Sequence, residues 1–160
     1  MIVATKGRMM LKVVKLTQDF LNANAKLTEA LHDKDRPYSV VTIVMNGLTF
    51  AIPLRTNLNH RFGVHLDTIW KEGKKCRRGI DFTKAVLVRD SSKELGETHI
   101  VPKSQKDVLI KKKKVIKNQF EKYVEGYVHA AKNDINGTLK GSAYKYCTLV
   151  NYHVDLGITK

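Results

Sequence analysis

The pattern of apolar residues in the early part of the chain predicts three strands. Leu11–Leu16 is a short apolar-rich run, and Ser39–Met45 and Leu48–Leu54 are longer β-branched runs. Asn46-Gly47 separates the last two, and such a pair between two strand runs is the strongest short signal of a hairpin with a type I′ turn. The chain is therefore expected to form a tight antiparallel hairpin there.

Weaker patterns extend this predicted sheet. Pro53 cannot donate to a strand ladder, so the second hairpin strand is expected to end there or to run at a sheet edge. Thr68–Lys71 is a candidate short strand and Gly79–Val88 a longer one. The segments Asn57–Gly63 and Asp90–Ser104 are predicted to be irregular.

Helical spacing marks the rest of the chain. Thr17 is a plausible N-cap for a helix that runs to about Leu31. Gln105–Lys132 is predicted to be one long helix, and Tyr146–Gly157 a short one. The long helix has a single apolar stripe, formed by Leu109, Ile116, Phe120, Tyr123 and Tyr127. Because strands and helices are segregated rather than alternating, the fold class expected is α+β with an antiparallel sheet.

The length of 160 residues predicts one domain. Residues 1–8 are expected to be a disordered extension and 9–160 the domain, with Met9 or Met10 as alternative starts to Met1. The chain shows no signal-peptide pattern and no apolar run of the roughly 18 residues that cross a membrane. Its two cysteines, Cys76 and Cys147, have no ligand spacing, which predicts free thiols in a cytoplasmic protein.

The charge changes this picture most. The chain has 29 Lys and Arg against 15 Asp and Glu, a net charge of +14. Such a charge attracts polyanions, and nucleic acid is the first partner expected. An anionic membrane is the competing partner, but it would call for a basic amphipathic helix with an exposed apolar face.

Several motifs of metal and nucleotide chemistry are missing. We find no P-loop, GxGxxG, HExxH or CxxC pattern, and the acidic residues are scattered. A nuclease of this composition would therefore need neither metal nor cofactor. RNA allows this, since its own 2′-OH can attack the adjacent phosphate. The protein then has to supply only an acid, a base and cationic stabilisation, for which His and Arg are suited.

The densest supply of these residue types flanks the predicted hairpin. The loop before it carries His32, Arg36 and Tyr38, and the loop after it carries a longer set: Arg55, Thr56, Asn57, Asn59, His60 and Arg61. Because a hairpin starts and ends at the same end of its strands, the two loops are expected to be neighbours. The alternative is that these are ordinary surface residues of polar loops.

Further basic and aromatic residues are candidates for RNA contact. Those after residue 70 are Lys74, Lys75, Arg77, Arg78, Lys111, Lys112, Lys113, Lys114, Lys140, Lys145, Tyr146 and Thr148. The first four are expected in a loop and the next four on the outer side of the long helix. Solvated surfaces explain the lysines equally well, and tyrosines that anchor the last helix explain Tyr144 and Tyr146.

Three stretches resemble one protein family. RPYSVVTIVMNGLTFAIPLRT (36–56), GIDFTKAVLV (79–88) and YKYCTLVNYHVDLG (144–157) are similar, in their order and spacing, to the toxins of type III toxin–antitoxin pairs. Within this ToxN/AbiQ/TenpN endoribonuclease family, the TenpN branch is the most similar, and the likeness spans roughly residues 9–158.

The resemblance implies a compact twisted sheet of the MazF/Kid barrel type. It implies metal-independent RNA cleavage that leaves 2′,3′-cyclic phosphate and 5′-OH ends. The implied partner is a repeated pseudoknot antitoxin RNA, which the toxin processes and with which it forms closed hetero-oligomers, without a protein antitoxin or a membrane. Cellular or phage RNA would be the substrate, in phage defence by abortive infection.

The resemblance also implies roles for individual residues. Arg36 and Arg55 would hold the scissile phosphate, Thr56 would position the 2′-OH or a phosphate oxygen, and His60 and His32 would share the acid and base work. Leu58 stands where ToxN-like proteins have a lysine. Two other classes stay open, namely a non-catalytic RNA-binding module and, less favoured, a DNA-binding repressor.

Overall fold

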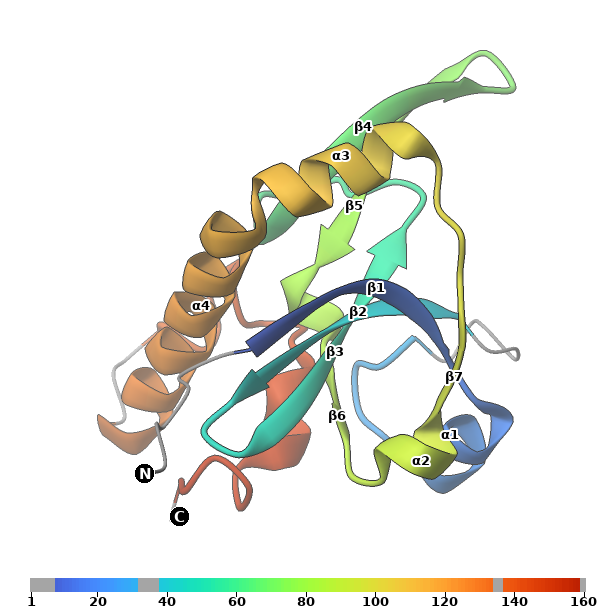
Figure 1. Cartoon of the computed structure of the whole chain (residues 1–160). Helices are drawn as coiled ribbons and strands as arrows, with labels where there is room; N and C mark the ends of the chain where they lie inside the picture. Colours follow the sequence, from blue (N-terminus) through green and yellow to red (C-terminus); the bar gives the residue numbers. More distant parts are fainter. Residues whose placement is uncertain (1–7, 32–37, 134–136, 159–160) are drawn as a thin grey trace.

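The computed structural model describes residues 8–31, 38–133 and 137–158 of the chain. Seven strands form one sheet, and helices pack against it (Figure 1). The strands are β1 (Arg8–Leu16), β2 (Ser39–Met45), β3 (Leu48–Arg55), β4 (Gly63–Lys71), β5 (Lys74–Asp81), β6 (Val86–Val88) and β7 (Leu95–Thr98). The helices are α1 (Gln18–Ala23), α2 (Ser91–Glu94), α3 (Lys103–Lys111) and α4 (Lys113–Asn133), with 3-10 turns η1 (Phe82–Lys84) and η2 (Thr148–Tyr152).

The expected α+β class with an antiparallel sheet is confirmed. The strand order is β4-β5-β3-β2-β1-β7, with β6 also paired to β3, and every pairing is antiparallel. The end strands β4 and β7 are not paired with each other, so the sheet is open. The closed barrel that the family resemblance implies is therefore not confirmed.

The hairpin at Asn46-Gly47 forms as the sequence predicts. Met45 faces Leu48 across the turn, and both turn residues have positive φ, 52° at Asn46 and 77° at Gly47. Asn and Gly tolerate this left-handed conformation, which type I′ turns require. Pro53, in contrast, neither ends β3 nor lies at an edge. It sits where β3 changes neighbour, between its pairing with β6 through Ala51 and with β5 through Leu54.

Strands β4 and β5 correct the predicted pattern most. They form a long hairpin that projects from the body of the molecule, which we call the arm (Figure 1). The basic residues from Lys74 to Arg78 were expected in a loop, but they lie in β5. The stretch Gly79–Val88 is not one strand, because β5 ends at Asp81 and η1 separates it from β6. The Asp81 carboxylate accepts the Thr83 N–H at 2.9 Å and so caps η1.

The helices differ from expectation in length. Thr17 is the predicted N-cap, accepting the Phe20 N–H at 3.2 Å, but α1 ends at Ala23 instead of near Leu31. Side-chain bonds from Asn151 to the backbone of Thr28, at 2.8 and 2.9 Å, hold the following segment in a non-helical path. The region Asp90–Ser104, expected to be irregular, contains α2 and β7.

The predicted long helix is divided at Lys112 into α3 and α4. Its apolar stripe is nevertheless confirmed, since all five of its residues are buried. Phe50 of β3 and Phe82 of η1 each meet the Phe120 ring of α4 edge-on, with ring centroids 5.3 Å apart. α4 therefore covers the sheet, while α3 runs on toward the arm (Figure 1). Over the described residues, no helix is long and apolar enough to cross a membrane.

Candidate active site

The start of β2 and the end of β3 lie side by side, as the hairpin argument predicts, since Val40 faces Pro53. Two clefts open there, and Arg55 lines both. The Thr56 cleft, about 420 Å³, is lined by Lys15, Tyr38, Arg55, Thr56, Arg78 and His99 among others. The Asp81 cleft, about 680 Å³, is lined by Arg55, His60, Asp81, Lys84, Lys140 and Tyr146 among others.

A buried carboxylate organises the Asp81 cleft. Asp81 is 2% exposed and accepts hydrogen bonds from the Thr83 hydroxyl at 2.6 Å and the Arg55 guanidinium at 3.1 Å. The oxygen that accepts from Thr83, Oδ1, also lies 3.2 Å from His60 Nε2, whereas Arg55 binds Oδ2. A buried charge is tolerated when it is paired and hydrogen-bonded in this way. Asp81 thus joins Arg55 and His60, two residues that the sequence analysis selected separately.

The His60 ring is held at both nitrogens. Its Nδ1 accepts the Phe62 backbone N–H at 3.0 Å, so the ring proton of the neutral form belongs on Nε2, facing Asp81. A proton-transfer group needs a nitrogen that points at the reacting atoms. In this conformation His60 has none to offer, so the geometry suits a positioning role.

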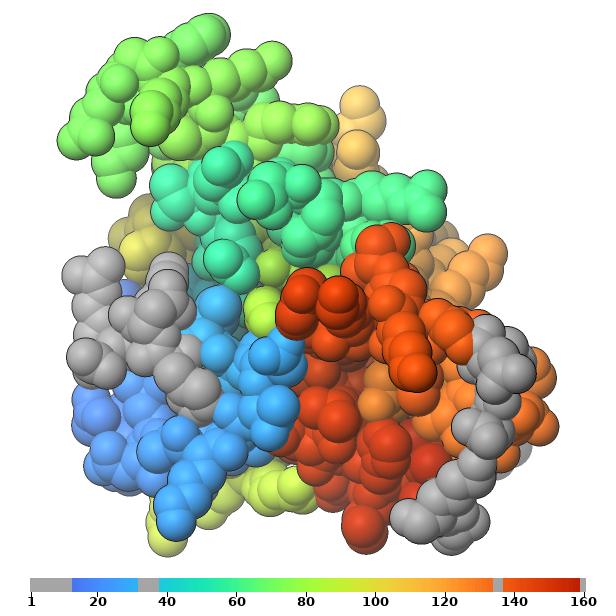
Figure 2. Space-filling view, turned by 180° about the vertical axis from the view of Figure 1, so that it is seen from behind, coloured from blue at the N-terminus to red at the C-terminus, as the bar shows by residue number. Residues whose placement is uncertain are grey.

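Cations line the walls of the Asp81 cleft. The Lys84 ammonium donates to the carbonyls of Glu29, at 2.7 Å, and Tyr146, at 2.8 Å, and so ties two distant segments together. The Lys145 ammonium lies 5.3 Å from the centroid of the exposed Tyr146 ring. Figure 2 shows this face, with the segment of residues 138–146 (orange-red) beside the loop that follows β3 (blue-green). The cleft can accept an anion and offers an aromatic face next to it.

The Thr56 cleft has a different chemical character. Thr56 is exposed at the end of β3, and Lys15 reaches the same cleft from β1. His99 follows β7, where its backbone N–H donates to the Val13 carbonyl at 2.7 Å. The described part of the chain offers no hydrogen-bond partner to either nitrogen of the His99 ring. This cleft therefore combines an imidazole, a hydroxyl and cations.

An ion pair forms one wall of the Thr56 cleft. The Arg78 guanidinium donates two hydrogen bonds to the Asp67 carboxylate, of 2.7 and 2.5 Å. Asp67 also accepts a hydrogen bond from the Ser104 hydroxyl at 2.7 Å. The Arg78 bond is the main reason that the pKa of Asp67 falls to about 2. Arg78 was a candidate for RNA contact, but in this fold two of its donors bind Asp67 of β4, and Ser104 at the start of α3 binds the same carboxylate.

The other selected residues fall into three groups. His32 and Arg36 lie outside the described residues, so their placement stays a prediction. The prediction that Thr148 contacts RNA is wrong, because Thr148 has no exposed surface and its hydroxyl donates to the carbonyls of Thr83 and Ala85. The remaining residues reach the surface: Asn57, Asn59, Arg61, Lys74, Lys75, Arg77, Lys111, Lys112, Lys113, Lys114, Lys140, Lys145 and Tyr146.

Leu58, Tyr144 and Cys147 were each discussed in the sequence analysis, and the structure shows their surroundings. Leu58 is 2% exposed, so an apolar residue fits where ToxN-like proteins have lysine. Tyr144 anchors the C-terminal segment by donating to the Tyr123 carbonyl at 2.8 Å. Cys147 is a structural thiol, because burial raises its pKa and the neighbouring His153 pairs with Tyr127 instead, at 2.7 Å.

Sequence reasoning missed four residues of the clefts: Lys15, Asp81, Lys84 and His99. Asp81-Phe-Thr has the spacing of an Asx cap, and this signal marked the end of β5. No comparable signal marks His99, which reaches the Thr56 cleft only because β7 pairs with β1.

Within the described residues, no three His, Cys, Asp or Glu side chains are arranged to hold a metal ion. The comparisons do not place the chain in a family, since no family model, no curated protein and no solved structure matches it.

Proposed function

We propose that this protein is a metal-independent endoribonuclease, and that the Thr56 cleft is where it cuts RNA. One observation carries the assignment. An imidazole without hydrogen-bond partners among the described residues, that of His99, opens into a cationic cleft beside the exposed hydroxyl of Thr56. Together with the net charge of +14, this set supplies what RNA needs to break its own backbone.

The proposed reaction is a transesterification. The ribose 2′ oxygen forms a bond to phosphorus as the bond from phosphorus to the 5′ oxygen breaks, which leaves a 2′,3′-cyclic phosphate and a 5′-OH. In this proposal His99 takes the proton of the 2′-OH, and Lys15, whose ammonium lies 3.9 Å from the Glu97 carboxylate, protonates the leaving oxygen. Arg55, held by Asp81 at 3.1 Å, and Thr56 bind the phosphate oxygens.

The Asp81 cleft has a binding role in this proposal. It shares Arg55 with the Thr56 cleft, so one RNA strand can pass from one cleft to the other across a single guanidinium. Lys140 and Lys145 would meet phosphates, and the exposed ring of Tyr146 would stack on a base. His60 keeps the loop between the clefts in place.

The family resemblance extends the proposal to biology. A toxin of a type III pair would be held inactive by a repeated pseudoknot RNA and would form closed hetero-oligomers with it. Free toxin would then cleave cellular or phage RNA in the cytoplasm, as part of phage defence. The barrel-type core of that family is likewise only an implication of the resemblance, because the sheet described here is open.

The test is an RNA cleavage assay with purified protein in EDTA. Unstructured RNA should be cut to fragments with 2′,3′-cyclic phosphate ends, and a single 2′-deoxy substitution at the cut nucleotide should block that cut. Intact RNA after incubation, at protein concentrations that bind it fully, would refute the enzyme proposal.

A non-catalytic RNA-binding protein is the second candidate. The observation that favours it is the His60 ring, whose two nitrogens are both engaged within the protein. This candidate predicts tight RNA binding without cleavage, and no toxicity on expression. The same assay, with binding measured in parallel, therefore decides between the two.

A further inference from the structure

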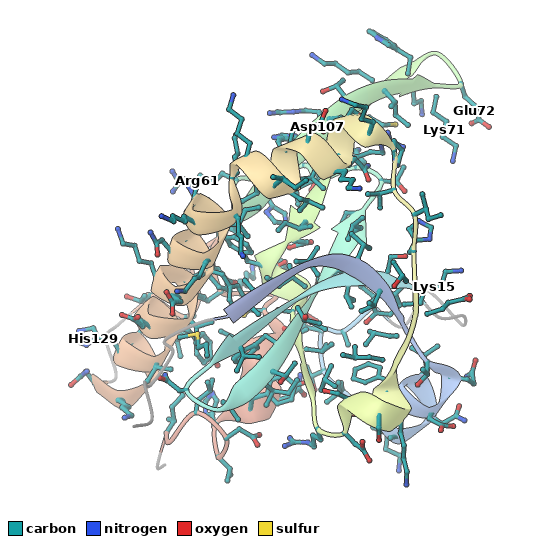
Figure 3. All side chains as sticks on the ribbon, in the orientation of Figure 1. Lys15, Arg61, Lys71, Glu72, Asp107 and His129 are labelled. Atoms are coloured by element: carbon teal, nitrogen blue, oxygen red, sulfur yellow. The ribbon has the colours of Figure 1, made fainter. Side chains whose placement is uncertain are left out.

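The arm carries an exposed tryptophan that nothing in the fold explains. Trp70, the only tryptophan of the chain, is 73% exposed near the end of β4. A single exposed apolar side chain is not by itself a binding site, so the residues that share its face decide what this ring can do. The tip beyond it is a tight turn at Glu72 and Gly73, with φ of 52° and 75° (Figure 3).

The register of the arm places cations on the same face as Trp70. Residues that pair across an antiparallel hairpin share a face, and alternate residues along a strand do so too. Trp70 pairs with Lys75 and Thr68 with Arg77, and all four are exposed. We call this surface the Trp70 face. Lys71 and Lys74 pair with each other on the opposite face, one position nearer the tip than Trp70 and Lys75.

The Trp70 face leads back to the Asp81 cleft. Leu66 is an extra residue between paired His65 and Asp67, and this bulge keeps His65 on the Trp70 face, opposite Gly79. The Arg77 guanidinium lies 2.9 Å from His65 Nδ1. Both residues line a hollow of about 470 Å³ together with Asn57, Asn59 and His60, which also line the Asp81 cleft. Figure 2 shows the arm (green) directly above this loop (blue-green).

Lys75 and Arg77 make the Trp70 face positively charged. Burial and the charges of Arg77 and Lys112 lower the pKa of His65. A neutral His65 can accept a hydrogen bond from Arg77 and so orient its guanidinium, whose other donors stay available. None of the four residues of the Trp70 face carries a negative charge. This charge pattern favours a polyanion over an acidic peptide of mixed sequence or a neutral ligand.

We propose that the Trp70 face is a binding track for single-stranded RNA, with Trp70 stacking on a base and Lys75 and Arg77 bound to phosphates. The track would guide the strand from the tip of the arm into the Asp81 cleft. Single-stranded nucleic acid is bound by this combination of an aromatic platform and a basic groove. The inference rests on the proposed function for the identity of its ligand.

Because Trp70 is the sole tryptophan, its fluorescence reports on the arm alone. The probe is a 12-residue oligouridine with 2′-O-methyl groups, which cannot be cleaved, carrying a dye at its 3′ end. Dye anisotropy measures binding anywhere on the protein, and tryptophan emission measures contact at Trp70. The track predicts that emission is quenched over the same concentration range in which anisotropy rises.

Matched variants separate the two faces of the arm. Lys75→Gln with Arg77→Gln should weaken binding about tenfold and make the slope of log affinity against log salt shallower by about 1.4, or 0.7 for each lost phosphate contact. Lys71→Gln with Lys74→Gln removes the same charge from the opposite face and should change affinity less than threefold, because charges that do not contact the strand act only through salt-screened attraction. Trp70→Ala should weaken binding about tenfold, and Trp70→Phe should retain most of it.

The outcomes are distinguishable. Rising anisotropy with unchanged emission, or equal losses from the two double variants, would overturn the track and leave RNA binding intact. No anisotropy change at any concentration would overturn the track and the proposed function together. A blue shift of the emission on vesicles of phosphatidylserine and phosphatidylcholine, without quenching by the oligonucleotide, would assign the arm to a membrane surface instead.

Discussion

The two clefts beside the end of β3 share Arg55 but differ in how their polar groups are used. In the Asp81 cleft, the carboxylate, the imidazole of His60 and the ammonium of Lys84 are all bonded to other groups of the protein. In the Thr56 cleft, the ring of His99 has no such partner within the described chain. Groups that already serve the fold can orient a ligand, whereas proton transfer needs a group with a free position.

This difference also concerns what holds each cleft open. The Asp81 cleft depends on one buried carboxylate that is contacted from several sides. Beside the Thr56 cleft, the Arg78–Asp67 pair lies nearer the surface. The Asp67 carboxylate of this pair also binds Ser104 and so attaches α3 to the sheet. The comparison teaches that the richer set of ionisable residues is not the better candidate for chemistry.

The largest expected effect is on cleavage. His99→Ala should reduce the cleavage rate about 1,000-fold, within the range of general acid–base catalysis, and leave the affinity for uncleavable RNA unchanged. His60→Ala should act mainly through a disturbed loop, with a loss of about tenfold. Single-turnover rates with excess enzyme measure both. A reversed ranking would move the chemistry to the Asp81 cleft.

The second effect is on the stability of the Asp81 cleft. Asp81→Asn should lower the free energy of unfolding by about 3 kcal/mol, because it leaves the Arg55 guanidinium without its buried counter-charge. Asp90→Asn is the control, since Asp90 is an exposed N-cap of α2 and Asn caps equally well. Urea unfolding measures both variants. Equal losses would show that Asp81 has no special structural role.

The third effect is the pH dependence of the Thr56 cleft wall. The pKa of Asp67 is lowered from 3.8 to about 2, so its ion pair contributes stability above about pH 4 that is lost as the pH falls through 2. The contribution is about 2 kcal/mol. Between pH 5 and pH 2, the wild type should therefore lose about 2 kcal/mol more than Asp67→Asn in urea unfolding. Parallel losses in the two proteins would contradict this assignment.

The smallest effect is on RNA affinity at the rim of the Asp81 cleft. Lys140→Gln combined with Lys145→Gln should weaken binding about fivefold at moderate salt, through lost phosphate contacts, without changing the rate of the bound complex. Lys93→Gln on the exposed surface of α2 is the matched control and should have no effect. Titrations with labelled uncleavable RNA measure the change, and an equal response to Lys93→Gln would indicate only diffuse attraction.

Local patterns allowed part of this molecule to be predicted. The turn at Asn46-Gly47, the cap at Thr17 and the stripe on α4 depend on interactions between residues close in sequence. The two loops that flank the hairpin were predicted to be neighbours, and Tyr38 does line one cleft with Arg55 and Thr56, while His32 and Arg36 lie outside the described residues. This prediction followed from the geometry of a hairpin, which fixes both ends of its strands at once.

The errors came from contacts between distant segments. The first helix was predicted too long because Asn151, more than 120 residues away, binds the backbone at Thr28. Thr148 was selected as a surface residue, yet it packs under η1 and β6. No local pattern contains such partners, because they meet only when the sheet and the C-terminal segment come together.

The sequence by itself determined the positive charge, the hairpin, the antiparallel α+β class and the concentration of Arg and His after β3, all of which depend on composition or short-range spacing. Only the tertiary structure decided that Asp81 would hold Arg55 and His60, that His99 would reach Thr56, and that Trp70 would stand on a basic arm. Burial and strand pairing decide these positions, because they set which polar groups are bonded within the protein and which stay open to a ligand.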